Sequence, residues 1–263
     1  MTQKYKLTAT VVSQEQLATD VYSMWLKSPE IASQAQAGQF IGMYPSDATK
    51  MLMRPISLCE IDAQKGLLRV VYRVTGPNAG TKEFSMLKTN DTLEIFGPLG
   101  NGFNIEGTQD KRVMLFGGGI GIPPMLELGK QLAKQQAKVM FVLGYRDEVF
   151  LAEECQQYGE VYLATEDGSL GTKGNVLDAV KQNALQADLL YACGPTPMLK
   201  ALQTYAKKHD LTCYLSLEER MACGIGACLA CVCQSVALDE HSHVKNKRVC
   251  KDGPVFLATE VEL

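Results

Sequence analysis

The sequence predicts an antiparallel β-barrel, then an α/β domain with a doubly wound parallel sheet, and finally a small cysteine-rich subdomain. Three observations predict this order. Short alternating hydrophobic runs between turn residues fill residues 6–96, and strands alternate with helical stretches from residue 112 onward. Five of the nine cysteines then gather after residue 216. We therefore expect domains at residues 1–105, 106–215 and 216–263.

Composition narrows the class of protein. The chain has 263 residues, of which 46% are hydrophobic and 21% charged, as in ordinary soluble globular proteins. A net charge of −3 without a basic run argues against a nucleic-acid partner. No stretch approaches the roughly 18 apolar residues of a membrane span, and residues 1–12 show no signal peptide. We expect a cytoplasmic protein without membrane contact.

The first domain is predicted from strand-length runs rich in β-branched and aromatic residues. Gly, Pro, Asn and Asp separate these runs, and the one helical window is Thr81–Lys88. Six such strands indicate a small antiparallel barrel. The predicted strands are Lys6–Val12, Val21–Leu26, Gln39–Tyr44, Ile56–Ile61, Leu67–Val74 and Thr92–Phe96.

The second domain begins with a short apolar strand, Val113–Phe116, a glycine-rich run and a helix that extends to Gln136. Repeated strand–helix units of this kind predict a parallel doubly wound sheet. The further strands are expected at Val139–Leu143, Val161–Ala164, Leu189–Cys193 and Thr212–Leu217.

The cysteine-rich segment carries the most specific motif. Cys223, Cys228 and Cys231 follow a C-x4-C-x2-C spacing, and Cys250 comes after a polar loop. This is the plant-type spacing of a [2Fe–2S] cluster. Gly224 and Gly226 suit a loop that bends sharply and turns its amides toward sulfur. We expect the four cysteines to ligate such a cluster.

Cysteines and histidines in such a segment can also serve a zinc site, a disulfide or a Rieske centre. A four-cysteine zinc site usually shows two C-x2-C pairs, and a disulfide does not suit a reducing compartment. His241 and His243 lack the cysteines of a Rieske centre and are expected in a solvated loop. Cys233 competes with Cys250 for the fourth position, but residues 232–236 read as a strand that leaves the loop, with Cys233 packed as a small hydrophobe.

Two motifs in the first domain could bind a nucleotide. In Arg54-Pro55-Ile56-Ser57 the arginine can fork onto a diphosphate, and Gly80-Thr81 opens a helix whose free N–H groups suit phosphate. Alone, each is also typical of a strand start or a helix cap. Their order around Val71-Tyr72-Arg73 resembles the flavin domain of the ferredoxin reductase superfamily. The resemblance implies that FAD is bound by Arg54, Pro55, Ile56, Ser57, Val71, Tyr72, Arg73, Gly80 and Thr81.

The glycine run of the second domain lies where a strand hands over to a helix. The amides around Gly119 and Gly121 can therefore cradle a pyrophosphate, which a side chain at Gly121 would obstruct. Cys193-Gly194 begins a second such turn. In the same superfamily this motif lies beside the nicotinamide, although Cys193 equally suits a buried strand end.

The choice between NAD and NADP stays open in the sequence. Arg146 could meet a 2′-phosphate, whereas Asp147, Glu166 or Asp167 could meet a 2′-hydroxyl. The acidic surroundings favour NAD.

The whole chain resembles the electron-transfer subunits of class 1B dihydroorotate dehydrogenase, most specifically in residues 216–228 and 249–256. The resemblance implies an oxidoreductase subunit of pyrimidine biosynthesis with FAD, one [2Fe–2S] cluster and NAD, and no catalytic acid–base residue. It also implies an FMN-containing catalytic partner in a heterotetramer of two of each. The alternatives are the small subunit of a sulfide dehydrogenase or ferredoxin:NADP oxidoreductase, and a zinc-stabilised flavin-binding regulator.

Overall fold

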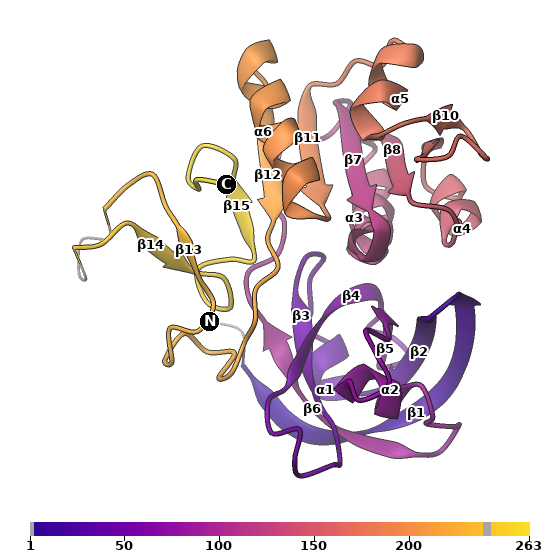
Figure 1. The fold of residues 1–263 in the computed structure, drawn as a ribbon, viewed down its shortest axis with the longest axis vertical. Coiled ribbons are helices and arrows are strands. Elements are labelled where there is room, and N and C mark those ends of the chain that lie inside the picture. Colours follow the sequence, from indigo (N-terminus) through magenta and orange to yellow (C-terminus); the bar gives the residue numbers. More distant parts are fainter. Residues whose placement is uncertain (1–2, 239–242) are drawn as a thin grey trace.

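The computed structural model describes residues 3–238 and 243–263, so the predicted loop residue His241 lies outside the described residues. Figure 1 shows the barrel below the α/β domain, with the C-terminal segment beside both. Within the described ranges, no helix has the length and apolar character needed to cross a membrane.

The barrel closes in the strand order β1-β2-β5-β4-β3-β6, with antiparallel neighbours throughout. All six predicted strands are present, although the first is much longer than predicted. The predicted helix at Thr81–Lys88 is shorter, and begins and ends earlier. The elements are β1 (Tyr5–Ala18), β2 (Val21–Lys27), α1 (Pro29–Ala32), β3 (Phe40–Tyr44), β4 (Arg54–Asp62), β5 (Leu67–Arg73), α2 (Gly80–Phe84) and β6 (Thr92–Leu99).

The second domain contains a seven-stranded sheet in the order β10-β9-β8-β7-β11-β12-β15. Every pairing is parallel except that of β12 with β15. The strands are β7 (Arg112–Gly118), β8 (Lys138–Tyr145), β9 (Glu160–Thr165), β10 (Thr172–Lys173), β11 (Leu189–Cys193), β12 (Thr212–Ser216) and β15 (Val255–Leu257).

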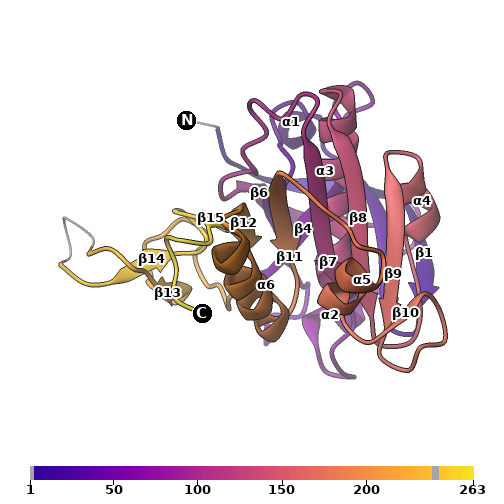
Figure 2. The same ribbon diagram turned by 90° about the horizontal axis from the view of Figure 1, so that it is seen from above.

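Helices cover both faces of this sheet, as Figure 2 shows from above. Residues of α3 and α4 share a core with Leu115 and Phe141, whereas residues of α5 and α6 share one with Met114 and Phe116. Alternate residues of β7 thus serve opposite faces, as the period of a strand requires. The helices are α3 (Ile122–Lys134), α4 (Ala152–Gln156), α5 (Val176–Gln182) and α6 (Thr196–His209), and a 3₁₀ turn, η1 (Gly119–Gly121), precedes α3.

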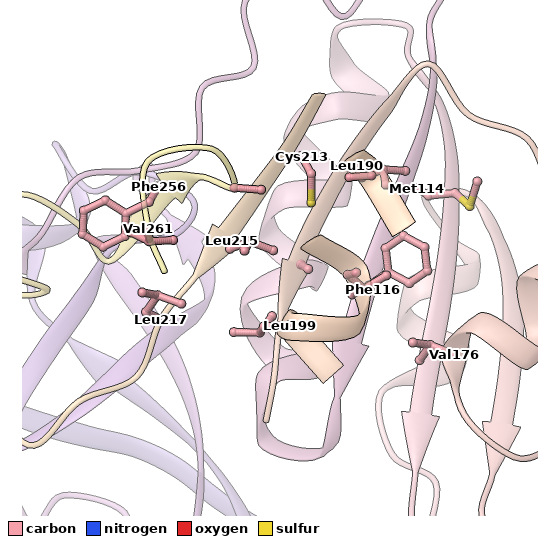
Figure 3. Close-up of a cluster of buried hydrophobic side chains, with 14 of the residues drawn as sticks. Met114, Phe116, Val176, Leu190, Leu199, Cys213, Leu215, Leu217, Phe256 and Val261 are labelled. Atoms are coloured by element: carbon pink, nitrogen blue, oxygen red, sulfur yellow. The ribbon is translucent and has the colours of Figure 1, made fainter. Parts of the chain in front are cut away.

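The cysteine-rich segment is built onto the edge of the sheet. Its strand β15 pairs with β12, and Phe256 and Val261 pack with Leu215 and Leu217 in one hydrophobic cluster (Figure 3). The outer strands β13 (Val232–Gln234) and β14 (Asn246–Arg248) form a separate antiparallel pair. The segment therefore shares the core of the α/β domain, which anchors the cysteine loop to it.

Candidate functional site

A cavity of about 940 Å³ lies where the barrel, the glycine-rich turn and the cysteine-rich segment meet. The barrel contributes Arg54–Ser57 and Val71–Arg73, and the turn contributes Ile120. The stretch from Ser216 to Met221, which connects β12 to the cysteine loop, lines it too. One ligand in this cavity would touch all three parts of the molecule.

One end of the cavity suits a diphosphate. A side chain at Gly80 would place its Cβ 2.7 Å from Nε of Arg54 and 2.8 Å from Cγ of Pro45, so only glycine lets the guanidinium lie against the start of α2. The hydroxyl of Thr81 is buried there without a hydrogen-bond partner among the described residues. A buried hydroxyl is costly unless it is bonded. A phosphate oxygen would satisfy it beside the Arg54 cation.

The strand segment Val71–Arg73 borders the cavity, but its side chains alternate between the two faces of the strand. Tyr72 is fully buried in the barrel core, where its ring meets Tyr22 and Phe84. Its hydroxyl donates to Oε1 of Gln14 at 2.7 Å, and burial raises the pKa of that hydroxyl. The tyrosine therefore supports the barrel, while Val71 and Arg73 stand on the other face of the strand.

The two predicted nucleotide turns touch each other. A Cβ on Gly121 would lie 2.3 Å from the carbonyl oxygen of Cys193 and 2.6 Å from the amide nitrogen of Gly194. A side chain at Gly121 would therefore force the two turns apart, which is a packing reason beyond the predicted obstruction of a pyrophosphate. Gly119 differs, because it has φ +51° and open space around its Cβ position.

Cys193 and Gly194 do not border the large cavity. Cys193 is buried, which raises the pKa of its thiol, and the neighbouring Glu218 raises it further. Gly194 borders a second cavity of about 460 Å³ between the start of α6 and β13. The structure thus brings the two turns together, but the Cys193 side chain is buried and lines neither cavity.

Glu218 is a site residue that the sequence singled out only as part of a signature. It lines both cavities, and although it is exposed to them, the protein packed around it raises the pKa of its carboxyl by desolvation. It lies two residues after the end of β12, at the carboxyl edge of the sheet where such folds bind ligands. Its place after a predicted strand of the parallel sheet is the feature of the sequence that could have identified Glu218 as a site residue.

The cysteine loop wraps its first thiol in backbone amides. Sγ of Cys223 accepts N–H groups from Ile225 at 3.5 Å, Ala227 at 3.3 Å and Cys228 at 3.4 Å. Positive φ angles at the intervening glycines, Gly224 and Gly226, turn these amides inward. Burial would raise the pKa of Cys223, but the donated hydrogen bonds outweigh it and lower the pKa to about 6.

The four predicted ligands lie in two pairs. Sγ of Cys223 accepts the amide N–H of Cys228 at 3.4 Å, and Sγ of Cys231 accepts the amide N–H of Cys250 at 3.4 Å. Among the described residues, no three His, Cys, Asp or Glu side chains converge closely enough to hold a single ion. The spacing of these four cysteines is that of a cluster of two irons, whereas a four-cysteine zinc site usually shows two C-x2-C pairs.

Cys233 lies on β13, which leaves the loop as the sequence predicted. Its half-buried side chain packs against the core, and burial raises the pKa of its thiol. Cys250 is buried on the returning segment. The structure therefore places Cys250, rather than Cys233, beside Cys231.

Comparison with known proteins identifies the family. The models of an oxidoreductase FAD-binding domain and an oxidoreductase NAD-binding domain match residues 8–103 and 115–204. The model of the iron-sulfur cluster binding domain of dihydroorotate dehydrogenase B matches residues 218–262. The chain is 45% identical over 258 residues to the dihydroorotate dehydrogenase B (NAD(+)) electron transfer subunit of Geobacillus kaustophilus, with 97% of both chains covered.

The chain belongs to the family of dihydroorotate dehydrogenase B electron transfer subunits. The Fusobacterium nucleatum member is 42% identical, again with 97% of each chain covered. The predicted fold and the predicted oxidoreductase function in electron transfer are therefore confirmed, with FAD-binding, NAD-binding and iron–sulfur domains. The individual binding residues stay predictions.

Solved structures agree on the fold. The structure of an NADH-dependent reduced ferredoxin-NADP oxidoreductase, described for flavin-based electron bifurcation, superposes with a TM-score of 0.85. It is 30% identical and covers 97% of this chain and 89% of its own. A ferredoxin reductase of carbazole 1,9a-dioxygenase, at 20% identity and a TM-score of 0.67, covers 79% of this chain and 67% of its own and shows the fold alone.

Proposed function

We propose that this subunit takes electrons at its cysteine loop from an FMN-containing dihydroorotate dehydrogenase subunit and passes them through a [2Fe–2S] cluster and FAD to NAD. One observation supports this order above all. The large cavity is lined at once by the barrel motif, by Ile120 of the glycine-rich turn and by the segment that leads to the cysteines. A flavin held there would adjoin both redox partners.

The flavin site is assigned to the barrel face of that cavity. Arg54, Gly80 and Thr81 would hold the diphosphate, since the cation and the unbonded hydroxyl lie together. Five of the remaining predicted residues would flank the rest of the cofactor: Pro55, Ile56, Ser57, Val71 and Arg73. Tyr72 would contribute through its backbone, because its side chain lies in the barrel core. A flavin exchanges hydride with nicotinamide and single electrons with an iron–sulfur cluster, so it belongs between the two.

The nicotinamide nucleotide is assigned to the paired turns. The N–H groups of the turn around Gly119 and Gly121 would receive its pyrophosphate, since Pro123 and Pro124 contribute none to the first turn of α3. Cys193 and Gly194 support that turn through their contact with Gly121. The curated relatives are named for NAD(+), and we assign the same nucleotide here.

The cluster is assigned to Cys223, Cys228, Cys231 and Cys250. The loop amides donated to Cys223 would stabilise its thiolate form, which a metal requires. Ile225, Cys228 and Leu229 are exposed on the same loop. Apolar side chains exposed around a redox centre suit a docking partner, and we place the catalytic subunit over them.

The assembly follows from the names of the relatives, since an electron transfer subunit implies a catalytic one. We propose two copies of each subunit and an FMN in the partner. A cytoplasmic location stays a prediction of the sequence.

A second candidate has support from one comparison. The bifurcating ferredoxin-NADP oxidoreductase shares 30% identity over 97% of this chain, so a role as the small subunit of such an enzyme would fit the same cavity. The higher identity to the dihydroorotate dehydrogenase subunits, 45% over 97% of the chain, favours the first candidate.

The test is reconstitution. The holoprotein should bind a dihydroorotate dehydrogenase catalytic subunit from the same organism and support reduction of NAD⁺ by dihydroorotate. Alone, it should oxidise NADH with an artificial acceptor and form no orotate. Orotate formation by the rigorously isolated chain, or one bound zinc without acid-labile sulfide, would contradict the proposal.

A further inference from the structure

The barrel and the α/β domain are joined where α3 lies against an open edge of β4 (Figure 1). β3 pairs with β4 only from Arg54 to Ser57, and the amide of Leu58 still reaches Gln39. Beyond that point, no described strand pairs with this edge of β4. Unpaired strand groups need partners when they are covered. Here α3 provides them.

Two side chains of α3 take the place of a neighbouring strand. Oε2 of Glu127 accepts the N–H of Ile61 at 2.9 Å, and Nζ of Lys130 donates to the carbonyl of Ile61 at 3.2 Å. Glu127 and Lys130 also pair with each other at 3.2 Å. Gln131 bonds the second carboxylate oxygen at 2.9 Å.

The contact of Glu127 and Lys130 with Ile61 is largely buried, so each of its hydrogen bonds matters for its stability. Glu127 is only 3% exposed. Burial alone would lower the pKa of Lys130, but the Glu127 carboxylate outweighs it and the pKa is raised. Removing one partner from such a pair leaves an uncompensated charge, which is strongly unfavourable.

The opposite face of α3 is fixed to the sheet. A Cβ on Gly129 would lie 2.1 Å from Cζ of Phe141 on β8, so helix and strand meet with no room for a side chain. The helix therefore cannot shift on its own sheet without breaking this contact. Whatever holds α3 to β4 also holds the α/β domain to the barrel.

Both elements begin at the large cavity. β4 starts with Arg54–Ser57, and α3 follows directly from the turn that contains Ile120. We propose that Glu127, together with Lys130, is a positioning residue that sets the separation between the nucleotide-binding turn and the flavin-binding strand. This inference rests on the proposed function, which assigns FAD and NAD to those two elements.

The expected consequence is a loss of rate rather than of binding. Hydride transfer needs reacting atoms about 3–3.5 Å apart, and a displacement of about 1 Å costs about 100-fold. Glu127→Ala should lower the rate of flavin reduction at saturating NADH, per bound FAD, by about 10- to 100-fold. Affinities for FAD and NAD⁺ should change little, because neither nucleotide is assigned to Glu127.

Two conservative variants refine this expectation. Glu127→Gln keeps an oxygen that can accept the Ile61 N–H, and should recover most of the rate. Lys130→Met keeps the apolar stem but removes the donor to the Ile61 carbonyl. Its rate of flavin reduction should lie between those of Glu127→Ala and Glu127→Gln. If Glu127→Ala does not fold, Lys130→Met carries the test: it should be slower than Glu127→Gln and show faster hydrogen exchange at Ile61, and an equal rate in the two variants would overturn the proposal.

Glu148 provides the matched control. Its carboxylate accepts the N–H of Thr19 at 2.6 Å and the Thr19 hydroxyl at 2.8 Å, so it also links the two domains, but on the surface. Glu148→Ala should change the rate less than about 3-fold, as exposed links contribute little.

The experiment measures two quantities on each FAD-loaded variant: the single-turnover rate of flavin reduction and the hydrogen exchange of the Ile61 amide. A slower rate with faster exchange at Ile61 in Glu127→Ala, and to a smaller degree in Lys130→Met, but not in Glu148→Ala, supports the proposal. An unchanged rate with faster exchange overturns it, as does an equal loss of rate in Glu148→Ala. An unmodified chain that binds no FAD, or whose FAD is not reduced by NADH, contradicts the proposed function instead.

Discussion

The large cavity and the cysteine loop prepare for their cofactors in different ways. The cavity contains a buried hydroxyl, that of Thr81, with no bonding partner among the described residues. In the cysteine loop, the thiol of Cys223 already accepts three backbone amides. We expect a bound ligand to complete the cavity, whereas much of the loop is shaped by its own backbone.

The difference follows from how each site is assembled. The cavity collects residues from β4, β5, α2, the glycine-rich turn and the segment after β12, so its form depends on the tertiary fold. Three of the cysteines lie within nine consecutive residues, and two glycines with positive φ bend the chain around them. A substitution in the loop should therefore either abolish cluster binding or leave it unchanged. A substitution in the cavity should weaken FAD binding by a graded amount.

The largest effect is expected at the fourth ligand. Cys250→Ser should abolish or shift the visible spectrum of the cluster, because Cys250 is paired with Cys231. Cys233→Ser should leave iron content and absorption nearly unchanged, since Cys233 packs on β13. Iron and sulfide analysis with visible spectra of both variants checks this. Loss of the cluster in Cys233→Ser with retention in Cys250→Ser would falsify the assignment.

Arg54 should have the next largest effect. Arg54→Ala removes the cation beside Gly80 and should weaken FAD binding by about 10- to 100-fold, as expected for one or two charge-assisted hydrogen bonds. The cluster should remain, because its ligands lie on another segment. Flavin released on dilution, measured by fluorescence, gives the affinity. Simultaneous loss of iron would mean that the two sites are not independent.

Two glycines in one turn should respond differently to the same substitution. Gly121→Asn pushes a side chain into the Cys193 backbone and should reduce stability by about 1–3 kcal/mol, as overpacking does. Gly119→Asn meets open space at φ +51°, a conformation that asparagine tolerates, so stability should change little. Denaturant unfolding measures both.

The Gly119 variant also tests the nucleotide assignment. A side chain there should raise the Michaelis constant for NADH while bound FAD is retained, because the turn is assigned to the pyrophosphate. A drop in bound FAD instead would show that the turn serves the flavin.

The smallest effect is expected at Thr81. Thr81→Val removes the unbonded hydroxyl and should weaken FAD binding by about 10-fold, the equivalent of one hydrogen bond. The FAD-free chain should be as stable as before, or more stable, because a buried unsatisfied group is lost. Thermal unfolding with and without FAD separates the change in FAD affinity from the change in stability of the FAD-free chain. A destabilised FAD-free variant would indicate that the hydroxyl already has a structural role.

Much of the fold was predictable because its signals are local. The six barrel strands and the alternation of strands with helices follow from hydrophobic period and turn residues, and the cysteine loop follows from spacing. Strand β15 was not predicted, since three residues, Val255–Leu257, carry no period and its partner β12 is distant in sequence. The predicted C-terminal subdomain consequently shares a core with the sheet.

The site was predictable only in part, for a related reason. Arg54 and Gly80 were identified as separate motifs, but that they meet is a tertiary fact. The alternation of β5 could have shown that Tyr72 faces the barrel core when Val71 does not. The contact between Glu127 and Ile61 could not be predicted from the sequence, because a glutamate within a helical stretch is usually a solvent-exposed residue.

The central claim is that one chain contains both a flavin and an iron–sulfur cluster and that they exchange electrons. Anaerobic titration of the holoprotein with NADH, followed by absorbance and electron paramagnetic resonance, tests it most directly. A flavin takes up two electrons and a [2Fe–2S] cluster takes up one, so complete reduction should require about three electrons per chain. Flavin bleaching complete at two electrons, with no signal from a reduced cluster, would contradict the account.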